Sequence, residues 1–264
     1  MLKTVTNSVQ RIRALSLQIM LIAGLLAIWQ WAAVTFPGPT LPPLLAVWRS
    51  YWRLVQGDLL HTAVLPSLYR LLIGFLIAAV GGALIGLAIG CSRSLDAWSR
   101  PVLEYLRYIP AIAILPPALL ILGPTDTMRI FVIAFGCIFP VLLAAIDGAK
   151  RVEPTFLDTA RVNGLGAIAR IRRVVLFAAM PSLFAGLRIA LGLGLIMMVI
   201  SELIAADNGI GFFILRSQRL FQSAGVYAGV LVIGTIGWLL TAGLLLVERR
   251  VLHWHRGWRG LPVD

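Results

Sequence analysis

Ionisable side chains inside or at the ends of long apolar stretches are the first candidates for chemistry in this sequence. They are Glu104, Arg107, Asp147, Arg188 and Glu202. Charged groups at membrane depth are costly, so they face a partner or a water-filled path. Glu104 and Arg107 are spaced to pair on one helix face, whereas Arg188 can snorkel to the surface or form a basic step for an anion. Structural pairing is the favoured interpretation, and a role in an anion path stays open.

A charged loop between two apolar stretches, residues 150–178, carries the second group of candidates. Pro154 and Thr155 can begin a helix in it, and Gly164 can end that helix. A second, amphipathic helix is expected at about 165–178, with basic side chains towards solvent or lipid phosphate. Its apolar side chains, expected to face the membrane, are Ile168, Ile171, Val175 and Leu176. From the residues alone, the loop is a surface segment anchored by basic side chains.

Motifs for enzymatic chemistry are absent from the sequence. It contains no GxxxxGKS/T for ATP phosphates, no HExxH for zinc and no GxSxG for a nucleophilic serine. His253 and His255 alternate beside a basic tail, but a metal needs more ligands than these two. We therefore expect no catalytic residue, no metal and no cofactor, so that energy from ATP would have to come from a separate subunit.

The composition places most of the chain in a membrane. Hydrophobic residues make up 59% of the 264 residues and charged residues 13%, against about 25% charged in a soluble domain. An ordinary soluble enzyme is thereby excluded, and an all-α membrane protein is expected. Between the first two spans, residues 44–55 are typical of an amphipathic helix along the external surface. Six transmembrane helices of about 20 residues each are predicted near 15–36, 67–90, 101–122, 130–146, 182–205 and 224–247.

The basic residues indicate how these six spans are oriented. Of the 23 lysines and arginines, fifteen lie at the chain ends and in the loops 91–100 and 147–181, whereas five lie in the other loops. Cytoplasmic loops carry the excess of basic residues, so both termini are predicted to be cytoplasmic. The net charge of +12 then needs no nucleic acid as a partner. The first span is interpreted as an uncleaved helix rather than a signal peptide.

Small residues and prolines predict how the spans pack. In the third span, Pro101 can occupy the first turn of a helix, whereas Pro110, Pro116 and Pro117 must kink or interrupt it. A broken backbone at membrane depth is compatible with a polar path or with packing against protein. Stripes of small residues, which let helix backbones approach closely, recur at four-residue spacing at Ala78, Gly82, Gly86 and Gly90 and at Gly186, Ala190 and Gly194.

The charged loop resembles the EAA motif of permease subunits from binding-protein-dependent ATP-binding cassette (ABC) importers. That motif has Glu-Ala-Ala, then a glycine, then an aliphatic-x-Leu-Pro, and this chain has Asp158-Thr159-Ala160, Gly164 and Val174-Val175-Leu176. It departs from the motif where Asp-Thr replaces Glu-Ala and where Phe177 replaces the first proline. Segments 67–75, 109–116 and 208–211 are also similar to this family, so the resemblance covers nearly the whole chain. Within this family, the chain resembles the nitrate/sulfonate/taurine-type subgroup.

The resemblance implies a fold and a docking segment. The fold would be the MetI-like core of a type I ABC importer permease, a single transmembrane domain over 1–264 with its core at 60–250 and an extra N-terminal span at 15–36. The short loop helix would dock on an ATP-hydrolysing subunit. Asp158 at the helix start would cap backbone donors or meet a basic partner residue, and Phe177 would let the second loop helix run on towards Pro181. The docking residues would be Asp158, Thr159, Ala160, Arg161, Gly164, Leu165 and Gly166.

The implied function is the permease of an importer for a small anion such as a sulfonate, taurine or nitrate, in a bacterial inner membrane. Its partners would be two ABC ATPase subunits, a periplasmic or extracellular binding protein, a second permease copy and membrane lipid. The translocation path would run along the third and fifth spans, with Pro110, Pro116, Arg188 and Glu202 as candidate residues. An exporter or secondary carrier without an ATPase would need coupling-ion carboxylates in the bundle. A membrane-embedded enzyme would need a clustered nucleophile, acid or metal set.

Overall fold

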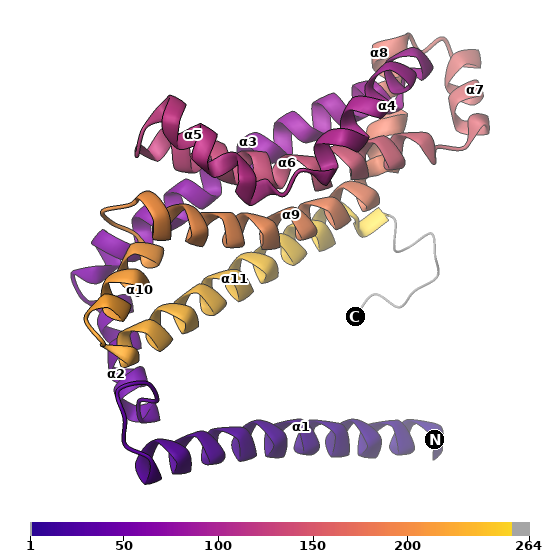
Figure 1. Ribbon diagram of the computed structural model, residues 1–264. Coiled ribbons are helices and arrows are strands. Elements are labelled where there is room, and N and C mark those ends of the chain that lie inside the picture. Colours follow the sequence, from indigo (N-terminus) through magenta and orange to yellow (C-terminus); the bar gives the residue numbers. More distant parts are fainter. Residues whose placement is uncertain (1, 255–264) are drawn as a thin grey trace. The chain divides into compact units, whose positions relative to one another are not determined.

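The computed structural model describes the backbone of residues 2–254 and the side chains of residues 16–254. Five of the seven basic residues at the chain ends that support the predicted orientation lie outside the described side chains, as does His255: Lys3, Arg11, Arg13, Arg256 and Arg259. The described chain is a succession of helices (Figure 1). Its contacts divide it into two units, one formed by α1, α2 and residues Phe213–Val232 and the other by the rest.

The first unit holds α1 (Leu2–Thr35) and α2 (Leu44–Gln56). The Trp29 indole N–H donates to the Pro42 carbonyl at 3.0 Å, and the Leu44 amide donates to the Gln30 side chain at 3.0 Å. The Trp29 ring also meets the edge of Tyr227, with 4.9 Å between centroids. These contacts hold the proline-rich turn between the two helices, and the amphipathic helix predicted at 44–55 is confirmed as α2.

The second unit is built on three long helices, in which α6 (Asp126–Lys150) packs against both α3 (Leu65–Gly90) and α9 (Leu176–Ala205). The stripes of small residues make this packing close. A methyl group built on Gly86 would lie 2.4 Å from the Leu142 carbonyl oxygen, which is too near for any side chain. Around these contacts, Leu71, Ile133, Val141 and Met198 form a core without exposed surface. The predicted close approach of the second and fifth spans to a neighbour is confirmed.

The predicted third span is a bent pair of helices. Helix α4 (Arg93–Tyr108) and the segment that contains a 3-10 turn (Ala111–Ile114) and α5 (Leu115–Leu122) meet at 90°. Pro110 lies at the bend and Pro116 lies in the first turn of α5, as expected for residues that lack a backbone donor. The expected position of Pro101 is wrong, because α4 begins eight residues earlier, where the Ser92 hydroxyl accepts from the Leu95 amide, and Pro101 lies inside the helix.

The charged loop also differs from the prediction in its second half. Helix α7 (Pro154–Val162) is the predicted first helix, but no separate amphipathic helix spans 165–178. Instead α8 (Ala167–Arg170) continues through a π-helical turn (Ile171–Val175) into α9. Of the four apolar side chains expected to face the membrane, Val175 is buried in the protein core and Ile168 is exposed. The expectation that the helix runs on past Phe177 is confirmed, since Pro181 lies inside α9.

Two short elements of the described chain were not expected from the sequence. A π-helical turn at Leu60–Val64 precedes α3, and α10 (Ile210–Arg219) lies between α9 and α11 (Ser223–Val251). Within residues 2–254, five helical segments are long and apolar enough to cross a membrane, and the bent pair α4–α5 makes a sixth if it counts as one span. The all-α membrane fold and the number of spans thus agree with the prediction.

Candidate functional sites at the two ends of the bundle

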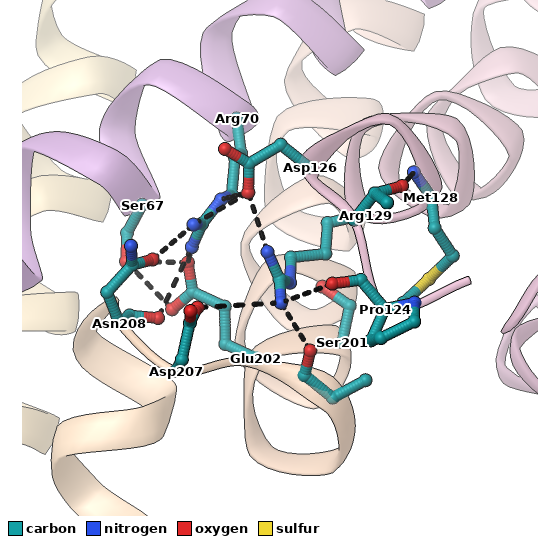
Figure 2. Close-up of polar contacts among 12 residues, drawn as sticks. Ser67, Arg70, Pro124, Asp126, Met128, Arg129, Ser201, Glu202, Asp207 and Asn208 are labelled. Atoms are coloured by element: carbon teal, nitrogen blue, oxygen red, sulfur yellow. Dashed lines mark hydrogen bonds and ion pairs between the residues drawn. The ribbon is translucent and has the colours of Figure 1, made fainter. Parts of the chain in front are cut away.

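One end of the second unit holds a cluster of charged and polar side chains, which we call the ion-pair cluster (Figure 2). The first turns of α3 and α6, the last turn of α9 and the turn after α9 meet there. This is why residues far apart in the sequence come together. The cluster consists of Ser67, Arg70, Asp126, Arg129, Glu202, Asp207 and Asn208.

Arg70 is the centre of the ion-pair cluster, and only 1% of its side chain is exposed. Its Nε donates to the Asp126 carboxylate at 2.8 Å, and its Nη1 donates to the Glu202 carboxylate at 2.8 Å. The same guanidinium donates to the backbone carbonyl and the side-chain oxygen of Asn208. A rigid planar fork with five donors suits such a junction. Arg70 therefore ties α3 to α6, to α9 and to the turn after α9 at once.

Glu202 has no exposed surface, and donors surround its carboxylate. Besides Arg70, the Ser67 hydroxyl donates to it at 2.7 Å and the Gly211 amide at 3.0 Å. The Ser67 oxygen in turn accepts from the Ile210 amide at 2.8 Å. A buried charge is tolerated only when it is paired and hydrogen-bonded in this way. The carboxylate thus anchors the start of α10 against α3.

Arg129 repeats the pattern one turn into α6. Its Nη1 donates to Asp126 at 2.6 Å, and its Nη2 donates to the backbone carbonyls of Pro124 and Ala205. Asp207 lies 3.9 Å away and is 89% exposed. The contact with Ala205 fixes the end of α9 beside the start of α6. Because donors already occupy these carboxylates, the cluster has the chemistry of a structural junction rather than of a general acid or base.

The opposite end of the unit carries the charged loop. The C-terminus of α7 is closed by the bonds of a Schellman motif, from the Leu165 amide to the Ala160 carbonyl at 3.0 Å and from the Gly164 amide to the Arg161 carbonyl at 2.9 Å. Gly164 has φ +72°, a conformation that favours glycine. The predicted end of the helix at Gly164 is confirmed.

Two charged side chains of α7 that the sequence singled out are largely exposed in the structure. Ala160 is buried, whereas Asp158 and Arg161 are 64% and 65% exposed and pair with each other at 3.1 Å. The suggestion that Asp158 caps the start of the helix is wrong. Because α7 begins at Pro154, Asp158 lies in the second turn, beyond the reach of the free N-terminal amides.

The four residues predicted to line a pathway do not form one group. Pro110 and Pro116 lie at the bend between α4 and α5. Arg188 donates to Glu248 of α11 at 2.5 Å. It precedes Glu202 on α9 by fourteen residues, which is about 21 Å along a helix. The pair expected between Glu104 and Arg107 is not formed in the described structure, where Arg107 lies over the Tyr108 ring, 5.5 Å from its centroid.

The described part of the chain contains no recognisable metal-binding site. No group of three or more histidine, cysteine, aspartate or glutamate side chains there could hold a metal ion. What the geometry offers instead is a bundle of membrane-spanning helices with an ion-pair cluster at one end and a helical excursion at the other.

Comparison with known proteins identifies the family. Residues 78–253 match the family described as binding-protein-dependent transport system inner membrane component. The chain belongs to this family. It is 32% identical over 251 residues to a taurine transport system permease protein of Escherichia coli, covering 92% of this chain and 91% of that one. It is 31% identical over 256 residues to a bicarbonate transport system permease protein of Synechococcus elongatus, with the same coverage.

A solved structure shows the same fold. The inward-facing methionine ABC transporter MetNI matches with a TM-score of 0.62 and 16% identity, covering 73% of this chain and 95% of that chain. This inner membrane component is therefore a multi-pass membrane protein with a MetI-like fold, and it is the permease of a binding-protein-dependent ABC importer. The resemblance noted from the loop is confirmed.

The ion-pair cluster was missed as a unit by reasoning from the sequence. Glu202 was singled out as an ionisable residue at a span end, but Ser67, Arg70, Asp126 and Arg129 were not linked to it. The available signal was the charge itself, because Arg70 and Arg129 each lie near the end of an apolar helix and need a partner there. The partners of Arg70 lie 56 to 138 residues away from it in the sequence, and this separation hid the pairing.

Proposed function

We propose that this permease imports a small oxyanion that an external binding protein delivers. Its relatives in Escherichia coli and Synechococcus elongatus are named for taurine and bicarbonate, both of which carry an anionic group of oxygen atoms. The nitrate, sulfonate and taurine class expected from the sequence has the same chemistry. The binding protein would select among these anions, while the permease would supply the path.

We propose that α7 and the turn after it dock on an ABC ATPase subunit. The observation that carries this proposal is the form of the excursion: a nine-residue helix, closed at Gly164, that leaves the bundle between α6 and α9. Its apolar side chains Phe156 and Val162 are 49% and 88% exposed, as expected of a surface that a partner covers. The docking residues are Asp158, Thr159, Ala160, Arg161, Gly164, Leu165 and Gly166.

Docking of an ATPase requires that α7 lie in the cytoplasm. The excess of basic residues in the loops at this end supports that orientation, with six spans placing both termini on the same side. The ion-pair cluster then lies at the external end of the bundle. There it would hold α10 and the preceding turn in place while the cytoplasmic end moves.

We further propose that the permease works as a homodimer. Each chain contributes a single transmembrane domain, and the translocation path runs between the two copies. Pro110 and Pro116 would shape the bent third span along this path, and Arg188 would offer a cation to the passing anion. Arg188 is 46% exposed, so solvent or an anion can reach it beside Glu248. Glu202 has a different position, because its carboxylate is enclosed by donors. We assign it to the junction rather than to the lining.

An Asp158→Lys variant tests the docking. It reverses the charge of an exposed side chain on α7 and breaks the pair with Arg161. We expect the variant protein to insert in the membrane at the wild-type level while ATP hydrolysis no longer drives uptake. Asp207→Lys is a matched control, since that carboxylate is also exposed but lies in the ion-pair cluster at the other end. Normal uptake by Asp158→Lys would overturn the docking assignment.

A further inference from the structure

A cavity of about 570 Å³ opens beside the charged loop in the second unit. The end of α3, the start of α4, the end of α6, and α7 with α8 surround it, and Figure 1 shows α4, α7 and α8 together at this end. Its charged side chains are five basic and one acidic: Arg93, Arg100, Lys150, Arg161 and Arg170, with Asp96. Such an excess of one sign in a concave site concentrates counter-ions.

The single carboxylate of the cavity is already shared by two of its cations. Asp96 accepts from Lys150 at 2.6 Å and from Arg100 at 3.2 Å. Arg161 pairs with Asp158, which does not line the cavity. The internal pairs thus leave the cavity with a large positive excess, and they position the cations that surround it.

Arg93 and Arg170 supply the unmatched charge. Neither forms an ion pair with any side chain of the described residues. The Nε of Arg170 is buried and has no hydrogen-bond partner in the described structure. Arg93 also lies in the first turn of α4, where the helix dipole favours an anion.

We propose that this cavity binds a phosphate group between Arg93 and Arg170, next to the docking segment. Guanidinium groups recognise phosphate oxygens through paired hydrogen bonds, and both arginines line the cavity. The phosphate can belong to a phospholipid headgroup or to a free phosphate ion. Occupancy of the site would link α8 to α4 across the cavity and would stabilise the base of the docking segment.

The test uses the purified full-length permease in detergent and two probes. The first arm measures thermal unfolding against sodium phosphate, with chloride used to keep the ionic strength constant. The second arm measures lipid adducts by native mass spectrometry with phosphatidylglycerol, and with phosphatidylcholine as a zwitterionic lipid of similar size. Stabilisation by phosphate identifies a free ion as the ligand. Preferential retention of phosphatidylglycerol identifies an anionic headgroup.

The variant that decides the proposal is Arg93→Gln/Arg170→Gln. Each lost charge-assisted hydrogen bond weakens binding by roughly tenfold or more, so we expect the responding probe to bind at least about tenfold more weakly. Arg249→Gln/Arg250→Gln removes the same charge from exposed positions at the end of α11 and should bind as the wild type does. The proposal is overturned if neither probe acts on the wild type, or if both variants weaken binding equally.

Discussion

The Arg70 guanidinium lies 2.8 Å from the Glu202 carboxylate, although 132 residues separate them in the sequence, and neither side chain has more than 1% of its surface exposed. This pair joins the second turn of α3 to the last turn of α9. A buried ion pair contributes little net stability compared with apolar residues at the same two positions. Removing one partner, however, leaves the other charge buried without compensation. The loss of stability should therefore be large when only one partner of the pair is replaced.

An Arg70→Leu variant should lose about 3 kcal/mol of stability, because Glu202 and Asp126 lose their shared partner. For a chain of this size the midpoint of thermal unfolding would fall by roughly 6–12 °C. Differential scanning fluorimetry in detergent measures it, with Arg249→Leu at an exposed position as the control. The double variant Arg70→Leu/Glu202→Leu should lose less than the two single variants together, since the stranded charge is gone. Strict additivity would contradict the coupling of the pair.

The turn after α9 should not tolerate a side chain at Gly209. This residue has φ +106°, and a methyl group built on it would lie 2.5 Å from the Glu202 carboxylate. Gly209→Ala should cost about 1–3 kcal/mol from backbone strain alone, and displacement of the carboxylate would add to this. Gly166→Ala is the matched control, because its φ is −64° and no atom lies within 4 Å of the new methyl group. Equal unfolding temperatures for the two variants would show that the turn is looser than described.

The contact between α3 and α6 should distinguish two glycines of the same helix. Gly86 faces the Leu142 carbonyl, whereas a methyl group built on Gly81 meets nothing within 4 Å. Gly86→Ala should destabilise the protein because backbone cannot move aside cheaply. Gly81→Ala should be neutral or stabilising by up to about 1 kcal/mol, the difference in helix propensity. Measured unfolding temperatures in the reverse order would refute this packing.

Variants of the two partners in the Arg188–Glu248 ion pair distinguish a role of Arg188 in the translocation path from a purely structural role. Arg188→Gln and Glu248→Gln both break the 2.5 Å contact, but only the first removes the cation. If the cation serves the anion, uptake should fall roughly tenfold in Arg188→Gln, about the effect of one charge-assisted hydrogen bond, and far less in Glu248→Gln. An equal loss of uptake in both variants would assign Arg188 to packing.

The sequence predicted those features that depend on local chemistry. Apolar length predicted the spans, and Pro154 and Gly164 predicted both ends of α7, because a residue without a backbone donor begins a helix readily and a glycine ends it readily. Prolines predicted the interruption of the third span. The 90° angle at Pro110 depends on packing and could not be predicted from proline alone.

Features that depend on contacts between distant parts of the chain could not be predicted from the sequence. Arg70 carries no local signal for Glu202, and only the cost of an unpaired charge in a membrane indicates that a partner exists. The assignment of Asp158 to a helix cap failed because the cap position is set by where the helix begins, four residues earlier. The segment predicted as a separate helix at 165–178 is helical from Ala167, but it continues into α9 instead of ending there. Val175 of this segment packs into the protein core, a tertiary contact that the sequence did not reveal.

The central claim is that α7 and its closing turn transmit ATP hydrolysis to the bundle, and a pair of glycine variants tests it most directly. Both Gly164 and Gly123 have a positive φ, +72° and +67°, and a side chain at either would meet no atom within 4 Å. A side chain at either position costs about 1–3 kcal/mol of backbone strain. Gly123 also has an extended ψ of −178°, a combination found almost only at glycine, so Gly123→Asp controls for the strain that Gly164→Asp introduces.

The measurement is ATP-dependent uptake of taurine, a sulfonate, nitrate or bicarbonate in proteoliposomes that hold the permease, its ATPase subunit and the binding protein. The account predicts that Gly164→Asp abolishes uptake and weakens co-purification of the ATPase subunit, while Gly123→Asp retains both. Wild-type uptake and wild-type retention of the ATPase subunit by Gly164→Asp would contradict it.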